Sequence, residues 1–173
     1  MEVQKLELVV GDIKGNREIA YALLVAEQPY FVNQNVIEEE GKLTIESLLT
    51  DEYYSWDKLI TMIDEEKLRH LINIGQLFHA LQDSIYTYNL SPNNLVFSRN
   101  GNPLFVFRGV KGQVPPYDVV SLDEFTVNFK AMIVSLLDKK TSYEKLIEGQ
   151  SPFYKGKLFC ETIMKAENLD EII

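Results

Sequence analysis

Four positions in the middle of the chain have the spacing of a site for phosphoryl transfer, but their residue types cannot carry it out. They are Asn89, Ser91, Asn94 and Phe107. Transfer to a hydroxyl group uses one Asp that accepts the proton and another that holds magnesium. An amide at position 89 accepts no proton at neutral pH, and a phenyl ring at position 107 offers no oxygen to a hard cation. The four positions therefore have the spacing of a phosphoryl-transfer site, but their side chains lack the groups that would carry out the reaction.

The spacing is that of the protein-kinase catalytic loop, His-Arg-Asp-Leu-x-x-x-Asn. Leu90 and Asn94 fall in register with this pattern, and the apolar residues 95–97 follow. Thr87-Tyr88 stand in place of His-Arg, and Ser91 stands in place of the catalytic-loop Lys. The loop is therefore predicted to keep its shape and to lack its chemistry.

The stretches on either side of the loop lack the other kinase groups. Counting on through the Asn100-Gly101 turn places Phe107-Arg108-Gly109 where kinases have Asp-Phe-Gly, so the Gly is present and the Asp is absent. Gly11 and Gly15 do not reproduce the phosphate-covering pattern Gly-x-Gly-x-x-Gly-x-Val. The apolar run 19–26, which we predict to be a strand, has no Lys to bind phosphates. We therefore predict a protein that is not an enzyme and that binds no cofactor and no metal ion.

Two other features favour structural roles over binding. Asn94 is the loop residue that could still contact a metal ion, but a lone Asn more often caps a turn. Trp56, with Tyr53-Tyr54 beside it, could form an exposed recognition patch. We favour packing of Trp56 in the core between the two parts of the fold, because large aromatic side chains contribute most when they are buried.

The remaining residues with reactive side chains form no recognisable site. His70 and His79 are nine positions apart in a predicted helix and have no partner at the i, i+4 spacing of a zinc site. We expect both at the surface or at its boundary. Cys160, the single cysteine, lies in the apolar phrase Leu158-Phe159-Cys160 and is predicted to be a buried structural residue.

The composition describes an acidic globular chain of 173 residues. Seventeen basic and 26 acidic residues give a net charge of −9, which argues against nucleic acid and anionic lipid as partners. A single cysteine excludes an internal disulfide and favours a reducing compartment. The sequence shows no signal peptide, and no apolar run approaches the roughly 20 residues that cross a bilayer. We expect one soluble domain.

The pattern of apolar residues predicts a small sheet followed by helices. Acidic residues precede the first long helix, where they favour the positive end of its dipole. We predict strands near 3–10, 19–26, 29–36 and 43–45, a charged hairpin tip at 38–42, a helix from 66 to about 88, strands at 95–98 and 104–108, a helix from 122 to 137, and short helices near 142–147 and 158–166.

This order of elements is that of a kinase, in which a sheet lobe precedes a helical lobe and the catalytic loop follows a long helix. We therefore predict an α+β, protein-kinase-like fold with a reduced N-terminal β-lobe, about 1–60, and a smaller helical C-terminal lobe, about 61–173. The two lobes form one domain over residues 1–173.

The chain resembles the cytoplasmic, pseudokinase-like domain of the EssB/YukC family, membrane components of type VII secretion systems in Gram-positive bacteria. The segments that carry the resemblance are Glu66–Ile74, Leu90–Phe97, Arg99–Pro103, Arg108-Gly109, Phe129–Ile133 and Tyr143–Gly149. The resemblance implies a non-catalytic scaffold that docks other proteins at the cytoplasmic face of the cell membrane. The implied partners are the membrane-bound ATPase and channel proteins of the machinery, and a second copy of the chain. Members of the family continue into a transmembrane helix and an extracellular domain, which we do not find in this sequence.

Two alternatives remain open at this point. An atypical kinase or nucleotide-sensing domain would use acidic residues elsewhere, such as Asp118 or Asp123. Those two residues are more simply explained by their place before or in the first turn of the helix predicted from Leu122. The other alternative is a soluble regulator that resembles a kinase only by fold and has no role in secretion.

Overall fold

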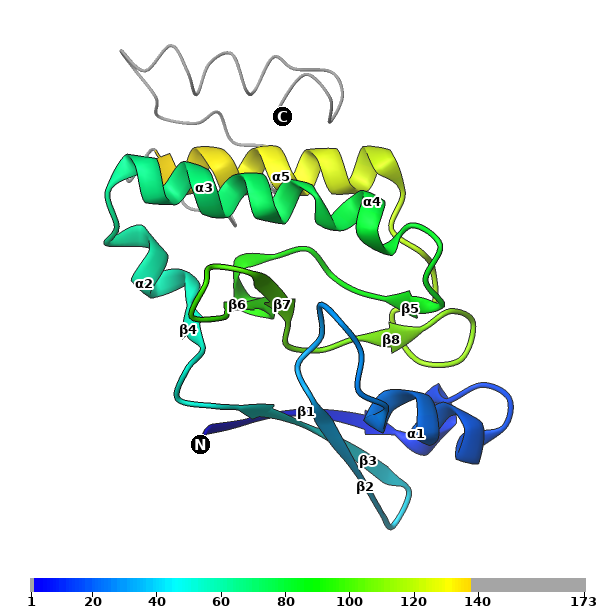
Figure 1. The fold of residues 1–173 in the computed structure, drawn as a ribbon. Helices are drawn as coiled ribbons and strands as arrows, with labels where there is room; N and C mark the ends of the chain where they lie inside the picture. The colour runs from blue at the N-terminus through cyan, green and yellow to red at the C-terminus, as the bar shows by residue number, and fades with distance from the viewer. Residues whose placement is uncertain (1, 138–173) are drawn as a thin grey trace.

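The computed structural model describes residues 2–137 and shows a sheet at one end and helices at the other (Figure 1). In Figure 1 a three-stranded sheet and α1 lie at the bottom, short strands lie in the middle, and α3, α4 and α5 cross the top. The elements are β1 (Glu2–Val9), η1 (Val10–Asp12), α1 (Arg17–Val25), β2 (Gln34–Glu39), β3 (Lys42–Leu49), β4 (Tyr54–Ser55), α2 (Trp56–Ile60), α3 (Asp64–Gly75), α4 (Leu77–Leu81), β5 (Tyr86–Thr87), η2 (Pro92–Asn94), β6 (Leu95–Phe97), β7 (Pro103–Phe105), β8 (Gly109–Val110) and α5 (Leu122–Leu137).

The N-terminal sheet is antiparallel, in the order β1-β3-β2. Alternate residues of β3, among them Leu43 and Ile45, are buried, so one face of the sheet packs on the core. The predicted charged hairpin tip is confirmed: Glu40 and Gly41 join β2 to β3 with φ of 50° and 79°. Two positive φ values are what a two-residue hairpin turn requires.

The prediction of a strand at 19–26 is wrong, because this run lies in the helix α1. The side chain of Asn16 accepts a hydrogen bond from the Ile19 N–H at 3.1 Å and caps the start of the helix. Ala20 and Leu24, four residues apart, are buried against the core, whereas Ile19 is exposed. A short apolar run does not distinguish a strand from a helix, and here the Asn cap decides. As a helix, the run is not comparable with the Lys-bearing strand of a kinase.

Two further element boundaries differ from the prediction. The strand expected at 29–36 begins later, at Gln34, because Tyr30 has φ of 70° and interrupts the extended backbone. The helix expected from 66 to 88 is divided into α3 and α4 at Gly75, a residue with low helix propensity, and ends at Leu81. Tyr86-Thr87 then form β5, which pairs with β8.

The strand pair that follows the loop is confirmed as a hairpin of β6 and β7, but its second strand ends at Phe105 and not at Arg108 as predicted. Its turn contains Gly101 with φ of 83°, so the Asn100-Gly101 pair supplies the positive backbone angle as expected. The outer edge of β7 is covered by the chain after α1, where Phe31 and Phe105 form a parallel bridge. This bridge brings the N-terminal part of the chain against the hairpin.

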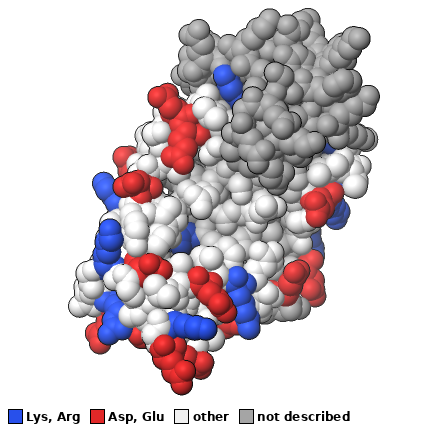
Figure 2. Space-filling model, turned by 180° about the vertical axis from the view of Figure 1, so that it is seen from behind, with Lys and Arg blue, Asp and Glu red and all other residues white. Residues whose placement is uncertain are grey.

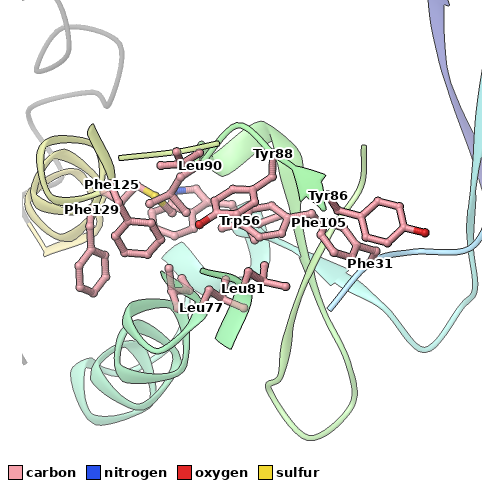
Figure 3. Packing of buried hydrophobic residues seen from close by; sticks show 14 of the residues in the cluster. Phe31, Trp56, Leu77, Leu81, Tyr86, Tyr88, Leu90, Phe105, Phe125 and Phe129 are labelled. Carbon is pink, nitrogen blue, oxygen red and sulfur yellow. The ribbon is translucent and has the colours of Figure 1, made fainter. Parts of the chain in front are cut away.

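One aromatic-rich core runs through the molecule (Figure 3). Phe125 and Phe129 of α5 lie on one side of it, Trp56 lies in the middle, and Phe31 lies towards the sheet. The prediction that Trp56 packs in the core is confirmed, since 7% of the residue is exposed. The helix predicted from 122 to 137 is also confirmed, as α5, with Phe125 and Phe129 inward.

Charged side chains are distributed unevenly over the face seen in Figure 2. Acidic and basic groups are interspersed over the lower, N-terminal part of this face, and a broad area across its middle is uncharged. No helix within residues 2–137 combines the length and the apolar character that a membrane crossing needs. The short helices predicted near 142–147 and 158–166, and Cys160, lie outside the described residues.

Candidate functional site: the loop and the cavity beneath β1

The four positions singled out in the sequence meet at one cavity. Its volume is about 490 Å³, and it lies between β1 and the loop that contains η2. The residues that line it are Leu6, Leu8, Asn89, Ser91, Asn93, Asn94, Phe107, Arg108, Pro115 and Pro116. The lining has an apolar floor and a rim of amides, and it contains no acidic side chain among the described residues.

Asn94 connects the loop to the segment that follows β7. Its amide oxygen accepts a hydrogen bond from the Phe107 N–H at 2.8 Å. Its amide nitrogen donates to the carbonyl oxygen of Phe107 at 3.2 Å and to that of Asn89 at 2.9 Å. The backbone carbonyl of Asn94 accepts from Val106 N–H at 2.9 Å. Both ends of the side chain are therefore engaged in holding two stretches of backbone together.

Phe107 lies at the position where kinases hold a metal ion, and its surroundings are apolar. The half-buried ring packs against both hydrophobic clusters of the core. Its backbone N–H and carbonyl are bound by Asn94. The position consequently contributes packing and backbone hydrogen bonds to the cavity, and it presents no oxygen atom from a side chain.

The residues in place of the kinase His-Arg are buried and structural. The Tyr88 ring stacks on Phe105 with 4.3 Å between the ring centroids. Burial raises the pKa of the Tyr88 phenol, and the negative charge of Glu124 raises it further. Thr87 is fully buried, and its hydroxyl donates to the Pro116 carbonyl. These contacts anchor the start of the loop to the core.

The side chain of Arg108 makes contacts with α1 that we did not predict from the sequence. Arg108 is 2% exposed, and the carbonyl oxygens of Leu23, Leu24 and Ala26 lie 3.1, 2.7 and 2.5 Å from its Nη2 and share the two N–H groups of that nitrogen. These carbonyls lie at the C-terminal end of α1, where a cation is favourable. Burial lowers the pKa of Arg108, and the ring of Tyr86 lies 4.5 Å from the guanidinium carbon. The Arg-Gly pair could be recognised in the sequence, but nothing in the sequence indicated that Arg108 would bond to Leu24, which lies 84 residues away.

Gly109, the last residue of the Phe-Arg-Gly triplet, is required by close packing. A Cβ atom at this position would lie 2.5 Å from the Pro115 carbonyl oxygen and would also overlap the Thr87 hydroxyl. The lack of a side chain therefore lets β8 pair with β5 directly beneath the loop.

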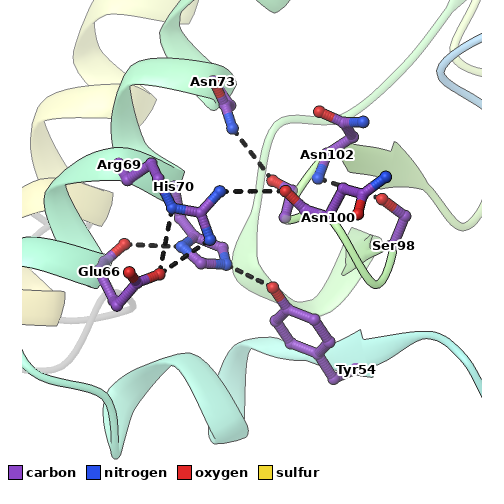
Figure 4. A network of polar contacts seen from close by, with 9 residues as sticks. Tyr54, Glu66, Arg69, His70, Asn73, Ser98, Asn100 and Asn102 are labelled. Carbon is purple, nitrogen blue, oxygen red and sulfur yellow. Dashed lines mark hydrogen bonds and ion pairs between the residues drawn. The ribbon is translucent and has the colours of Figure 1, made fainter.

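The expectation that His70 lies at the surface or its boundary is wrong, because its side chain is fully buried. Figure 4 shows its ring between two partners: Nδ1 lies 2.6 Å from the Glu66 carbonyl oxygen and Nε2 lies 2.5 Å from the Tyr54 hydroxyl. Since a carbonyl only accepts, Nδ1 carries the proton and Nε2 accepts from Tyr54. His79 is exposed, in agreement with the expectation.

The same part of α3 holds the turn between β6 and β7. Arg69 donates to the Asn100 carbonyl at 3.0 Å, and Asn73 donates to the Gly101 carbonyl at 3.2 Å. Figure 4 shows these donors reaching from the helix to the turn. The hairpin of β6 and β7, which directly follows the loop, is thereby fixed to α3.

Acidic residues and metal ligands do not gather at the cavity in the described part of the chain. Asp118 and Asp123, the alternative acidic residues, are exposed and do not line it. Asp123 lies in the first turn of α5. Over residues 2–137, no three His, Cys, Asp or Glu side chains lie close enough together to hold a metal ion.

Sequence comparisons relate most of the chain to one group of secretion proteins. The family model of the WXG100 protein secretion system (Wss) protein YukC matches residues 9–173. The type VII secretion system protein EssB of Staphylococcus aureus is 32% identical over 164 residues, in several strains. The match covers 95% of this chain and 36% of that protein, so the chain spans about a third of the length of the curated relatives it matches.

Comparisons with solved structures agree. The crystal structure of the S. aureus EssB cytoplasmic fragment matches with a TM-score of 0.87 at 29% identity, covering 97% of this chain and 94% of the fragment. The Geobacillus thermodenitrificans EssB cytoplasmic fragment matches with a TM-score of 0.77 at 15% identity, covering 97% and 79%. A divergent Toxoplasma kinase that lacks the glycine-rich loop matches with a TM-score of 0.52 at 12% identity, covering 98% and 65%. The predicted α+β, kinase-like fold is confirmed.

Proposed function

We propose that this chain, which belongs to the YukC family of the WXG100 protein secretion system, is a non-catalytic docking domain of that machinery. The proposal assigns the kinase-like fold a role in binding proteins and no role in phosphoryl transfer. It also applies to the whole span 1–173 as one domain, with a sheet part of about 1–60 and a helical part of about 61–173.

The observation that best supports the proposal is that the side chain of Asn94 is hydrogen-bonded to the backbone of the fold. In a working kinase this Asn binds the second magnesium ion. Here its amide oxygen accepts from Phe107 N–H, and its amide nitrogen donates to two backbone carbonyls. The group that remains from the catalytic loop is thus bonded into the fold. Asn89, Ser91 and Phe107 around it supply neither a base, nor a phosphate-binding cation, nor a carboxylate ligand.

The partners that fit the proposal are other components of the same machinery, its membrane ATPase and its channel proteins. A domain of this family would meet them at the cytoplasmic face of the membrane, in agreement with the description of the S. aureus and Geobacillus structures as cytoplasmic fragments. In the longer proteins of which such fragments are parts, the membrane would be reached through a segment outside this chain.

Thermal unfolding with nucleotide tests whether the chain binds Mg-ATP, which phosphoryl transfer would require. A ligand at 100 times its Kd stabilises a protein by about 2.7 kcal/mol, which raises Tm by several degrees for a domain of this size. We expect no rise in Tm with millimolar Mg-ATP relative to magnesium chloride at matched ionic strength. A rise of several degrees that increases with the concentration of Mg-ATP would count against the proposal.

Capture from native membranes tests the docking role. The chain is immobilised and incubated with detergent-solubilised membranes of the source bacterium, with heat-unfolded chain as the control. We expect secretion components to be recovered by the folded chain, equally with and without Mg-ATP. If the folded chain recovers none of them, the docking role is wrong.

The second candidate is a nucleotide-sensing or atypical kinase domain, and the cavity of about 490 Å³ beneath β1 is the observation in its favour. Asn93→Trp at the rim of the cavity would block it, whereas Asn35→Trp on the exposed face of β2 is a matched control. Stabilisation by nucleotide that is lost in the first variant and kept in the second would establish this candidate. No stabilisation of the parent chain, together with no phosphate release under varied metals, would exclude it.

A further inference from the structure

We propose that a docking partner binds along β1 as an extended segment, which adds a fourth strand to the N-terminal sheet and places alternate side chains in the cavities beneath that strand. The inference rests on the proposed docking function and names the form that the partner's binding segment takes. β1 is eight residues long and lies at one edge of the sheet. Peptides that add to a sheet edge gain affinity from main-chain hydrogen bonds and specificity from pockets for alternate side chains.

The backbone groups on this edge are free to pair. The hairpin turn at Glu40-Gly41 makes Lys42 bond to β2, so every second residue of β3 after it bonds to β2 and the residues between them bond to β1. The even-numbered residues of β1 therefore bond to β3, and the backbone groups of its odd-numbered residues point away from the sheet. Within residues 2–137, the outward N–H groups of Val3, Lys5 and Glu7 have no hydrogen-bond acceptor. A partner strand would supply these acceptors.

Two cavities lie beneath this strand. The cavity of about 490 Å³ described above is lined by Leu6 and Leu8 of β1. A second cavity, of about 550 Å³, is lined by Glu2 and Gln4 of the same strand, and Asn93 of the loop lines both cavities. All four even-numbered residues of β1 thus line one cavity or the other, so together the cavities extend along the whole strand.

The two cavities differ in character, and this defines the segment that fits. In an antiparallel pair, directly opposite residues lie on the same face, so partner residues opposite the even-numbered positions of β1 face the cavities. The first cavity has an apolar floor that includes Phe107 and Pro115-Pro116, which suits an aromatic or large aliphatic side chain. The lining of the second cavity includes the charged residues Asp57 and Lys58, which suit a polar side chain.

The other face of β1 adds a charge pattern. Val3 and Val9 are 40% and 55% exposed near the two ends of the strand. Between them, Glu7 forms no ion pair with any described residue, and Lys5 Nζ lies 3.8 Å from a carboxylate oxygen of Glu46 with most of its side chain exposed. Opposite charges directly across a strand pair are favourable. The segment that fits therefore has an acidic residue opposite Lys5, a basic residue opposite Glu7 and apolar residues at both ends.

Fluorescence anisotropy with a labelled peptide tests the inference on the full 173-residue chain. The probe is Val-Phe-Lys-Leu-Glu-Thr-Val, labelled through an N-terminal Gly-Ser linker. With its first Val opposite Val9, its Phe lies opposite Leu8 and its Glu lies opposite Lys5. We expect saturable binding with a Kd below about 1 mM. The same peptide with Ala in place of Phe should bind at least about tenfold more weakly, because it leaves the apolar cavity unfilled.

Two variants of the chain test the main-chain pairing and the cavities. Lys5→Pro removes an outward N–H that β3 does not use, and it should abolish peptide binding while near-ultraviolet circular dichroism shows a folded chain. Asn93→Trp places a large side chain between the two cavities and should weaken binding at least about tenfold. Asn35→Trp, on the exposed face of β2, is its matched control and should bind as the parent does.

A charge exchange tests the register. Lys5→Glu should weaken binding of the probe about fivefold, because it places like charges across the pair. A second peptide, with Lys in place of its Glu, should recover this loss. Lys111→Glu, an exposed charge reversal far along the chain, should bind the first probe as the parent does.

The inference is wrong if the parent chain does not bind the probe, which would mean that another segment or a second copy covers this edge. It is also wrong if Lys5→Pro binds as tightly as the parent, or if the exchanged peptide does not recover the loss in Lys5→Glu. Capture from native membranes separates this inference from the docking function. If Lys5→Pro and Asn93→Trp recover the same secretion components as the parent, the docking function stands on another surface and the inference is wrong. If the parent binds the probe and recovers no secretion component, the docking function is wrong and the peptide-binding edge remains.

Discussion

Replacement of Asn94 separates a structural amide from one kept for metal or nucleotide. The three side-chain hydrogen bonds of Asn94 join Asn89 and Phe107 across the cavity. Asn94→Ala removes all three and leaves the Phe107 N–H without its acceptor. Asn93→Ala, one residue earlier, removes an exposed side chain of the same type that makes no such bonds. The two variants form a matched pair.

The expected loss follows from the number of bonds. A net contribution of about 1 kcal/mol for each hydrogen bond gives a decrease of about 2–3 kcal/mol in the free energy of unfolding for Asn94→Ala. Asn93→Ala should stay within about 0.5 kcal/mol of the parent, as surface substitutions do. Asn94→Asp keeps the acceptor for Phe107 N–H but directs a carboxylate oxygen at two carbonyls. We expect it to be at least as destabilising as Ala at neutral pH, and less so when acid protonates the carboxyl group.

Urea unfolding measures these differences. Trp56 is the single tryptophan and is buried, so its fluorescence reports the transition. The midpoint of Asn94→Ala should fall while the slope with urea concentration stays constant. If Asn94→Ala and Asn93→Ala unfold at the same midpoint, the amide does not hold the loop, and the explanation for its retention is wrong.

Three further substitutions test other contacts of the same region by urea unfolding. Gly109→Ala should destabilise the protein by about 2 kcal/mol, because its Cβ would lie 2.5 Å from a backbone carbonyl and overlap Thr87; an unchanged midpoint would contradict the close packing. Arg108→Met should lower stability by about 2 kcal/mol, because three carbonyls at the end of α1 lose their donor; a midpoint at or above that of the parent would show that the cost of burying the charge outweighs these bonds. The folded-state pKa of Tyr88 lies above its ordinary value of about 10, so its contribution is complete below pH 10 and is lost as the pH rises further. Tyr88→Phe should therefore lose less stability between about pH 9 and 11 than the parent, and an equal loss in both proteins would contradict the burial of this phenol.

Much of the fold was predictable because local patterns agreed with the final packing. The apolar positions of Leu122–Leu137 recur at helical spacing, and the helix has the predicted bounds. Asn100-Gly101 and Glu40-Gly41 lie in the turns where positive φ is needed. The run 19–26 was misassigned because its apolar character fits a buried strand as well as a helix. The cap that decides between them, Asn16, lies outside the run.

The sequence predicted which positions form the candidate site, but it did not predict the hydrogen bonds and the burial around that site. Motif spacing placed Asn89, Ser91, Asn94 and Phe107, and all four line one cavity. The bonds of Arg108 to α1 and the burial of His70 depend on segments that are far apart in the sequence. Spacing along the chain contains no information on such contacts, since they form only when the sheet and the helices pack.

Residues 107–109 are held by two sets of hydrogen bonds, and these affect whether the segment can move. Asn94 holds the backbone of Phe107 on one side, and Arg108 is bonded to the end of α1 on the other. In kinases the Phe of the corresponding triplet changes its packing between active and inactive states. Here that movement would break both sets of hydrogen bonds at once, which opposes it. In the docking role that we propose, a segment held in this way would not act as a switch, and the activity of the domain would be set by which molecules are present to be joined.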